Sequence, residues 1–265
     1  MCRLLGYLGP TIQLEKILCK PQHSLIVQSY RPQEMAEALL NADGYGIGWY
    51  HPTQSYEPFT YRNVLPIWND LNLESLGRYI ESDRILAYVR SATPGQGVTL
   101  ANCQPFRHGN LLFTHNGYIQ EFRQTLYRPM RNQLSDAIYQ SIDGNTDSEH
   151  LFALFLNQLG ELSRDQAPLD QALSKTFEQL KHLAEPDQIR ILANVIVTDG
   201  QEMVASRWTH AGNAPTLYWL QNPPEFPNAV ILASETLFPG DWQLCPEQTL
   251  IHVKPDGSVH FQPLP

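Results

Sequence analysis

The sequence predicts a layered α+β fold in which two β-sheets form a sandwich covered by helices. Short strand-like segments occur in both halves of the chain, helical segments lie between them, and no repeat or low-complexity stretch separates one part from another. With 265 residues, of which 42% are hydrophobic, the chain is long enough to bury a sizeable core. We therefore expect a single domain over residues 1–265.

The expected strands are short and rich in β-branched or aromatic residues, which favour pleated, half-buried surfaces. In chain order they are residues 3–8, 44–50, 84–89, 110–114, 190–198, 202–208, 229–233 and 249–253. Apolar residues that recur every three or four positions predict helices at residues 33–40, 133–142, 148–159 and 169–183. A flexible turn at residues 94–97 follows one of the strands, and we interpret it as a lid.

Composition and charge exclude several function classes. The formal net charge of −9 argues against broad nucleic-acid binding, which depends on Lys and Arg side chains that neutralise phosphates. The longest helical apolar run, residues 151–156, is too short to cross a bilayer, and the chain does not begin with a signal-peptide pattern. We therefore expect a cytoplasmic protein that binds neither nucleic acid nor membranes, while a homo-oligomer stays open.

The four cysteines, at positions 2, 19, 103 and 245, are too scattered for a disulfide framework, and none forms a Cys-x-x-Cys pair typical of zinc sites. Most free cysteines are small buried apolar residues. Cys2 differs because removal of Met1 would leave it with a free α-amine. Such an amine has a pKa of about 7.7 to 8.0 and a thiol about 8.5, so the amine can deprotonate its own thiol. Position alone leaves Cys2 open as a structural residue or a nucleophile.

The pair Asn116-Gly117 lies between two apolar runs. Asn-Gly is the strongest short signal for a hairpin turn, so a turn is the simplest structural interpretation. The functional alternative uses the Asn116 amide and the Gly117 N–H as donors to a developing oxyanion, each typically worth about 3 kcal/mol. We assign no role to the adjacent His115, since an N-terminal amine makes a separate base unnecessary.

Two further segments have both a structural and a functional interpretation. Arg90 ends a predicted strand, where its planar guanidinium can form a structural ion pair or bind a carboxylate through two parallel hydrogen bonds. Thr146 and Glu149 fit a capping box, and Asp147 falls in the first helical turn, where the helix dipole favours a negative charge. Capping alone explains the second segment without a ligand.

Together, Cys2 and residues 90–93, 115–117 and 146–149 occur in an order and spacing that resemble the class II glutamine amidotransferases, and residues 232–235 resemble a strand end that recurs in this family. The resemblance implies a four-layer αββα sandwich of the N-terminal-nucleophile hydrolase type. It also implies roles for individual residues: Cys2 as nucleophile after removal of Met1, Asn116 and Gly117 as oxyanion hole, Arg90 and Thr93 as ligands of the substrate α-carboxylate, and Asp147, with the Gly117 carbonyl, as ligand of its α-ammonium.

Within the family, residues 2–9, 41–46, 90–95 and 105–109 are most similar to the ergothioneine-pathway amidohydrolases. This similarity implies a stand-alone hydrolase that releases glutamate from γ-glutamyl-hercynylcysteine sulfoxide through a Cys2 thioester, with no metal or organic cofactor. The betaine of such a leaving group favours a cation–π contact, for which Trp49, Trp68 and Phe106 are candidates. Two alternatives remain: a glutaminase subunit that delivers ammonia to a separate synthase, and a non-catalytic protein that binds a γ-glutamyl metabolite.

Overall fold

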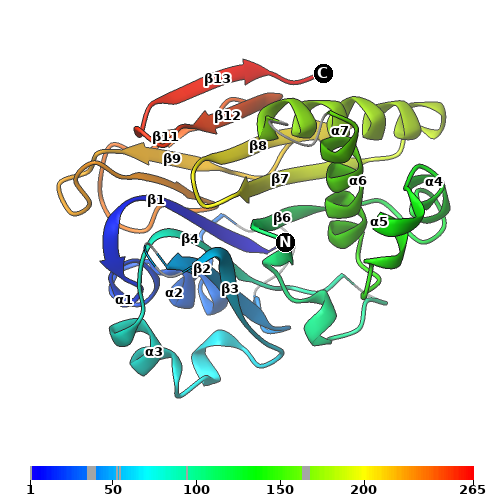
Figure 1. Ribbon diagram of the computed structural model, residues 1–265. Coiled ribbons are helices and arrows are strands. Elements are labelled where there is room, and N and C mark those ends of the chain that lie inside the picture. Colours follow the sequence, from blue (N-terminus) through cyan, green and yellow to red (C-terminus); the bar gives the residue numbers. More distant parts are fainter. Residues whose placement is uncertain (1, 35–39, 52, 54, 94, 163–167) are drawn as a thin grey trace.

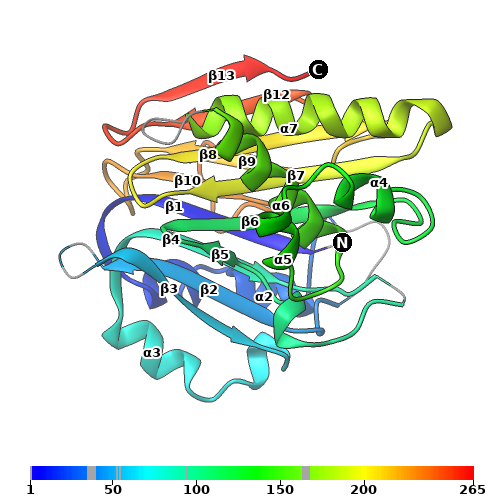
Figure 2. The same cartoon turned by 45° about the vertical axis from the view of Figure 1, so that its right-hand side comes forward.

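The computed structural model describes residues 2–34, 40–51, 53, 55–93, 95–162 and 168–265. It confirms the layered α+β prediction, because two antiparallel sheets stack face to face and helices cover the outer face of each (Figure 1). The same four layers are visible in a view turned by 45° (Figure 2). Separate clusters of buried apolar side chains fill the three spaces between these layers.

The first sheet has the strand order β11-β9-β10-β1-β4-β2-β3, and its paired neighbours are antiparallel. Its strands are β1 (Arg3–Gln13), β2 (Tyr45–His51), β3 (Ser55–Asn63), β4 (Glu81–Val89), β9 (Tyr218–Gln221), β10 (Val230–Ala233) and β11 (Gln243–Leu244). Helices α1 (Glu15–Leu18), α2 (Leu25–Tyr30) and α3 (Leu73–Tyr79) lie on its outer face. Strand β1 is central, so the chain's amino end is enclosed by β4 on one side and β10 on the other.

The second sheet has the order β13-β12-β8-β7-β6-β5, again with antiparallel neighbours. Its strands are β5 (Phe106–His108), β6 (Leu111–Ile119), β7 (Ile191–Thr198), β8 (Met203–His210), β12 (Thr249–Val253) and β13 (Val259–Pro263). Helices α4 (Tyr127–Arg131), α5 (Asp136–Gln140), α6 (Asp147–Glu161) and α7 (Leu169–Ala184) lie on its outer side. Short single-turn 3-10 helices at Ile67–Asn69, Leu100–Asn102 and Glu185–Asp187 complete the described elements.

Alternation along β1 decides which side chains face the space between the sheets. Successive side chains of a strand point to opposite faces. Leu4 and Leu8 belong to the apolar cluster between the sheets, together with Cys2, whereas Leu5 and Tyr7 belong to the cluster under α1–α3. The Cys2 side chain therefore points into the space between the two sheets, next to the first residue of β1.

All eight predicted strands are present, although β1 and β6 continue beyond their predicted ends to Gln13 and Ile119. The prediction missed β3, β5, β9, β11 and β13, which lie at or next to sheet edges, where one side is solvated and the hydrophobic signal is weak. Helices α5, α6 and α7 match three of the predicted helices. The fourth, residues 33–40, falls largely outside the described residues.

The hairpin interpretation of Asn116-Gly117 is wrong. Both residues lie within β6, where Asn116 pairs with Asn194 and Gly117 with Ala193 of β7. Glycine is required here because a Cβ on Gly117 would overlap the carbonyl oxygen of Leu192 on that neighbouring strand. Local turn chemistry is thus overridden by close packing of two strands.

Candidate active site

Cys2 lies at the entry to β1, and its side chain is 7% exposed. Its Sγ accepts a hydrogen bond from the backbone N–H of Ser91 at 3.3 Å, and the thiol can donate to the Ser91 carbonyl at 3.4 Å. The phenol of Tyr88, in the same inter-sheet layer, interacts with this thiol. Burial raises the pKa of Tyr88 well above its usual value, and the neighbouring Cys2 group raises it further. The phenol is therefore neutral beside the sulfur.

The other cysteines are poor nucleophiles. Burial raises the pKa of the Cys245 thiol to about 12 and that of Cys19 to about 11, and burial also raises the pKa of Cys103. Since the thiolate is the reactive form, these three thiols are inert near neutral pH. This agrees with their interpretation as small apolar residues.

Asn116 enters the same inter-sheet layer from β6. Along this strand, Leu111, Phe113 and Ile119 belong to the cluster under α4–α7, while Leu112 belongs to the inter-sheet cluster, so even-numbered side chains face the first sheet. The Asn116 side chain is fully buried; its Nδ2 donates to Ser234 Oγ at 3.4 Å. Its Oδ1 has no hydrogen-bond partner among the described residues, a state that costs about 1–3 kcal/mol.

Gly117 presents its backbone to the free edge of β6. In an antiparallel pair, alternate residues direct both N–H and C=O to the same side. His115 N–H donates to Gln104 Oε1 at 2.5 Å and Ile119 N–H donates to Asp147 Oδ2 at 2.8 Å, both away from β7. The Gly117 N–H and C=O lie between these two contacts on that edge. They are therefore not used by the β7 ladder.

His115 faces away from Cys2. Its ring lies on the α6 side of the sheet, where Nδ1 contacts Ser148 Oγ at 2.8 Å and Nε2 contacts the Leu192 carbonyl at 3.1 Å. Burial lowers the pKa of His115, partly opposed by the charge of Asp147. Both ring nitrogens are occupied on the far face, so the geometry gives no Cys-His dyad.

Arg90 directly follows β4 and is 3% exposed. Its NH1 group donates to the carbonyl of Gly97 at 3.1 Å and to that of Asp43 at 3.5 Å, while NH2 has no partner among the described residues. No described carboxylate pairs with this guanidinium, so the structural ion-pair interpretation is wrong. A buried guanidinium with an unused donor is suited to bind an anionic ligand.

Asp147 begins α6 and is 4% exposed. Its Oδ2 accepts the Ile119 N–H and its Oδ1 accepts the Ser148 N–H at 2.9 Å, with the Gln96 amide at 3.4 Å. Within the predicted lid, Gln96 thus contacts Asp147 and Gly97 contacts Arg90; Pro94 lies outside the described residues. Thr93, in contrast, has an exposed side chain.

The capping prediction at α6 is correct for one of its two hydrogen bonds. Thr146 is the N-cap, and its side chain accepts the Glu149 N–H at 3.2 Å. The Glu149 carboxylate does not return to Thr146 but accepts the N–H groups of Asp143, at 2.9 Å, and Gly144, at 2.8 Å. Glu149 therefore organises the loop that precedes Asp147.

The three aromatic candidates lie apart from Cys2. Trp49 packs on Phe59 with ring centroids 5.0 Å apart and belongs to the cluster under α1–α3, and Trp68, at 37% exposed, packs against Tyr30. Phe106 is buried in the cluster under α4–α7. None of the three rings belongs to the inter-sheet cluster that contains Cys2, and the alternation of β2 turns Trp49 toward the cluster under α1–α3. A cation–π contact of these rings with a leaving group stays a prediction.

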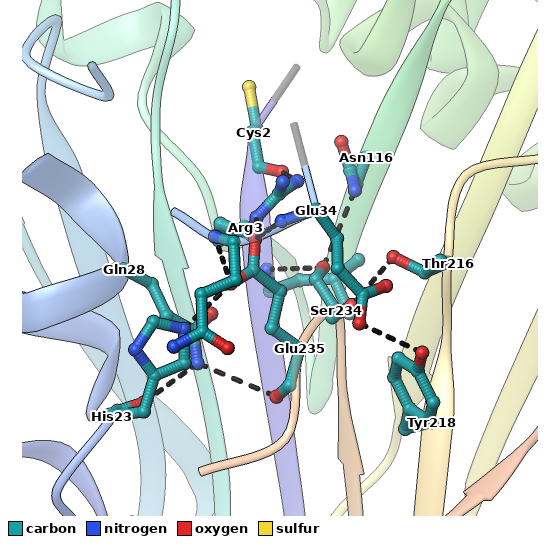
Figure 3. Close-up of polar contacts among 12 residues, drawn as sticks. Cys2, Arg3, His23, Gln28, Glu34, Asn116, Thr216, Tyr218, Ser234 and Glu235 are labelled. Carbon is teal, nitrogen blue, oxygen red and sulfur yellow. Dashed lines mark hydrogen bonds and ion pairs between the residues drawn. The ribbon is translucent and has the colours of Figure 1, made fainter. Parts of the chain in front are cut away.

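A buried polar network beneath Cys2 was not expected from the sequence (Figure 3). Arg3 donates from NH1 to the Cys2 carbonyl at 2.8 Å and from Nε to Glu235 Oε1 at 2.6 Å. Glu235 Oε2 accepts from His23 at 2.7 Å and from the Gln33 N–H at 2.8 Å. Burial would raise the pKa of Glu235, but His23, Arg3 and backbone N–H groups outweigh it and lower the pKa to about 2.

A signal for this network was present in the sequence. Arg3 interrupts an apolar strand and Glu235 follows another, and a buried charge requires a partner. The sequence does not show that these two residues pair with each other, since they are 232 positions apart. Among the described residues, no group of three or more His, Cys, Asp or Glu side chains is placed to hold a metal ion, and no described helix is long and apolar enough to span a bilayer.

Comparisons with known proteins agree on one family. A family model described as "Glutamine amidotransferases class-II" matches residues 1–237. A Mycolicibacterium smegmatis protein named gamma-glutamyl-hercynylcysteine sulfoxide hydrolase is 28% identical, with 100% of both chains covered. A Saccharomyces cerevisiae protein named "Probable glutamine amidotransferase DUG3" is 30% identical over 96% of this chain and 82% of its own. The solved structure of a glutamine aminotransferase class-II domain protein from Silicibacter pomeroyi has the same fold, with a TM-score of 0.71 at 21% identity and 99% of each chain covered.

Proposed function

This chain belongs to the class-II glutamine amidotransferase family, and we propose that it is a stand-alone γ-glutamyl amidohydrolase that uses Cys2 as its nucleophile. The observation that carries the proposal is the position of Cys2, whose sulfur lies 3.3 Å from the Ser91 N–H in the same layer as the Asn116 amide. A thiol at the second residue can take its base from its own α-amine once Met1 is removed.

The proposed cycle needs only groups of this chain. The Cys2 α-amine takes the thiol proton, the thiolate attacks the γ-carbonyl carbon, and the carbonyl oxygen becomes an oxyanion held by Asn116 and the Gly117 N–H. The C–N bond then breaks as the amine returns the proton to the leaving nitrogen. A γ-glutamyl thioester remains, and a water molecule deprotonated by the same amine releases glutamate and restores the thiol.

The glutamyl end is proposed to be held by two buried groups of opposite charge. Arg90 offers its unused NH2 donor to the α-carboxylate. Asp147 and the Gly117 carbonyl accept from the α-ammonium, and Thr93 completes the carboxylate site. Residues 96 and 97 now contact Asp147 and Arg90, so a bound glutamyl group exchanges these loop contacts for its own. Holding both ends brings the reacting atoms within near-attack distance.

For the substrate we propose γ-glutamyl-hercynylcysteine sulfoxide, cleaved to glutamate and hercynylcysteine sulfoxide in ergothioneine biosynthesis. The name of the M. smegmatis relative, which this chain matches over its full length, supports this choice. The net charge of −9 is compatible with a leaving group that carries a quaternary ammonium. We place the reaction in the cytoplasm.

The test is a panel of γ-glutamyl amides that includes glutamine and a γ-glutamyl amide of a betaine-bearing amino acid. Purified protein that begins at Cys2 is incubated with each, and glutamate release is followed. We expect the betaine substrate to have the highest kcat/KM. Equal or faster turnover of free glutamine would overturn the substrate assignment but leave the amidohydrolase proposal standing.

The second candidate is a glutaminase subunit that delivers ammonia to a separate synthase chain. It is favoured by the yeast relative, named as a glutamine amidotransferase, which aligns with 96% of this chain. In that case glutamine is the preferred substrate and a partner chain stimulates its hydrolysis. A protein that binds γ-glutamyl amides without releasing glutamate would instead be a non-catalytic binder.

A further inference from the structure

We propose that Ser234 and Glu235, which follow β10, position the Cys2 nucleophile and the Asn116 amide relative to each other. The inference rests on the function proposed above, because it assigns these two residues to the same site. Figure 3 shows the arrangement: Glu235 reaches Arg3 beneath Cys2, while Ser234 lies between β1 and the Asn116 side chain. Both residues are buried, and they contact Arg3, Leu4 and Asn116, so we assign them as positioning residues.

The Glu235 side of this arrangement holds the backbone of Cys2. The Arg3 guanidinium donates to the Cys2 carbonyl at 2.8 Å and to Glu235 at 2.6 Å. Arg3 is 1% and Glu235 1% exposed. Glu235 is itself held by His23 and by two backbone N–H groups. The residue that carries both nucleophile and base is therefore fixed through its carbonyl, the part of Cys2 that takes no part in the chemistry.

Stability alone does not account for such a pair. A buried ion pair loses about as much through desolvation as it gains by attraction, and apolar residues of similar volume often stabilise a fold equally well. The pair instead holds the Arg3 guanidinium where it donates a hydrogen bond to the Cys2 carbonyl. Because Glu235 balances Arg3, this donor adds no net charge next to the α-amine, which must be neutral to act as a base.

On the other side of the arrangement, Ser234 orients the side-chain amide of Asn116. Ser234 Oγ accepts the Leu4 N–H at 3.0 Å and lies 3.4 Å from Asn116 Nδ2, while Asn116 Oδ1 is buried without a partner among the described residues. In the proposed active orientation, the Asn116 side-chain amide is rotated by half a turn, so that Oδ1 and Nδ2 exchange places. The Ser234 hydroxyl then donates to Oδ1, and both Nδ2 protons are free for the oxyanion. Ser234 thus fixes the oxyanion donor to the strand that carries Cys2.

The first test is Ser234→Ala, with Thr216→Val as the matched control. Thr216 donates to the Ser234 carbonyl at 2.8 Å, so the control removes one hydrogen bond from the same place without touching Asn116 or Leu4. For Ser234→Ala we expect kcat to fall about tenfold or more, the rate equivalent of one lost hydrogen bond, with KM within about twofold because the oxyanion exists only in the transition state. An unchanged kcat, a change in KM alone, or an equal kcat loss in the control overturns the role of Ser234.

The second test is Glu235→Gln, with Glu247→Gln as the control that removes a carboxylate from another arginine, Arg207. We expect a fall in kcat of about tenfold or more in Glu235→Gln alone, with KM nearly unchanged. Should this variant not fold, Arg3→Lys is used, because an ammonium can pair with Glu235 but cannot also reproduce the fork to the Cys2 carbonyl. Wild-type kcat in the variant that folds, or a loss equal to that of the control, overturns the role of Glu235.

A third measurement separates this inference from the proposed function. Iodoacetamide alkylation of Cys2, followed by peptide mass spectrometry, needs no substrate. In Glu235→Gln the unpaired Arg3 cation stabilises the thiolate, so we expect half-maximal alkylation at a lower pH than in wild type. The other titratable groups that face the Arg3–Glu235 pair are His23, Glu34 and Tyr218. None of them is substituted in this variant. An unshifted midpoint counts against the positioning role even if no γ-glutamyl amide is cleaved, whereas an inactive wild type with a shifted midpoint overturns only the proposed function.

Discussion

Ser91 donates its backbone N–H to the sulfur of Cys2 across 3.3 Å, which joins the segment after β4 to the residue just before β1. A backbone donor stabilises a thiolate, and no substitution at position 91 other than proline, which lacks an N–H, removes it. The sulfur therefore has a fixed direction as soon as β1 and β4 pair. What the side chain of Cys2 and its α-amine contribute can then be tested separately.

The α-amine is tested by the state of the N-terminus. We expect mature active protein to begin at Cys2 by intact mass. An uncleavable N-terminal extension turns the amine into an amide without basicity, so the protein should fold with an unchanged melting temperature yet lose about 10²- to 10⁴-fold in activity. Full activity of the extended protein would contradict the N-terminal-nucleophile mechanism.

The thiol is tested by two substitutions at the same position. Cys2→Ala should be inactive, and Cys2→Ser should be folded but much slower, because a hydroxyl is a weaker nucleophile than a partly ionised thiol. Single-turnover glutamate release measures both variants. Cys103→Ser is the control, since burial raises the pKa of that thiol and it should be dispensable for turnover. Comparable activity of Cys2→Ala and wild type would leave the nucleophile unidentified.

The glutamyl clamp is tested at both of its charged ends. Arg90→Lys should raise KM strongly, because an ammonium cannot form the bidentate fork on a carboxylate. Arg84→Lys, on the adjacent strand β4, is its control, since Arg84 donates to the Gly9 and Asp83 carbonyls. Asp147→Asn should weaken substrate binding and also lower the melting temperature, because both Asp147 oxygens accept backbone N–H groups. Wild-type kinetics in folded Arg90→Lys and Asp147→Asn would return these residues to structural roles.

A pH-dependent loss of stability is expected from His150 on α6. Arg131 Nε donates to its Nε2 at 2.8 Å and its Nδ1 contacts the Thr146 carbonyl at 2.7 Å, so the ring is neutral. Burial foremost, and the charge of Arg131, lower the pKa of His150 to about 4 despite the opposing Thr146 bond. Only the unfolded state gains this proton between its ordinary pKa of about 6.5 and about 4. The free energy of unfolding should therefore fall as pH falls through that range, by roughly 3 kcal/mol in total from this residue.

Urea unfolding at pH 7 and pH 5 measures this effect. His150→Gln does not titrate, and its amide can still accept from Arg131, so its stability should depend less on pH than that of wild type. His108→Gln, at an exposed position, is the control and should retain the wild-type pH dependence. An identical pH dependence in all three proteins would show that His150 is not the group responsible.

Much of the site follows from local sequence. Cys2 behind Met1, Arg90 at a strand end and Asp147 in a first helical turn are each read from a few neighbouring residues, because chain position, periodicity and capping are local properties. Alternation of apolar residues likewise predicted the strands on which two of these three depend. The motif order then predicted the family, which the match over residues 1–237 confirms, while the individual site roles stay predictions.

The faces and partners of these residues depend instead on how strands distant in sequence pair and pack. Asn-Gly is a turn signal by itself, but pairing of β6 with β7 keeps Asn116 and Gly117 in a strand. The same strand turns His115 to the α6 side and Asn116 to the Cys2 side, which no single segment reveals. Arg3 and Glu235 meet across 232 positions because β10 is the neighbour of β1. Strand order is set by packing of the whole apolar core. A local pattern of apolar residues indicates that one face of a strand is buried, but not which element covers that face.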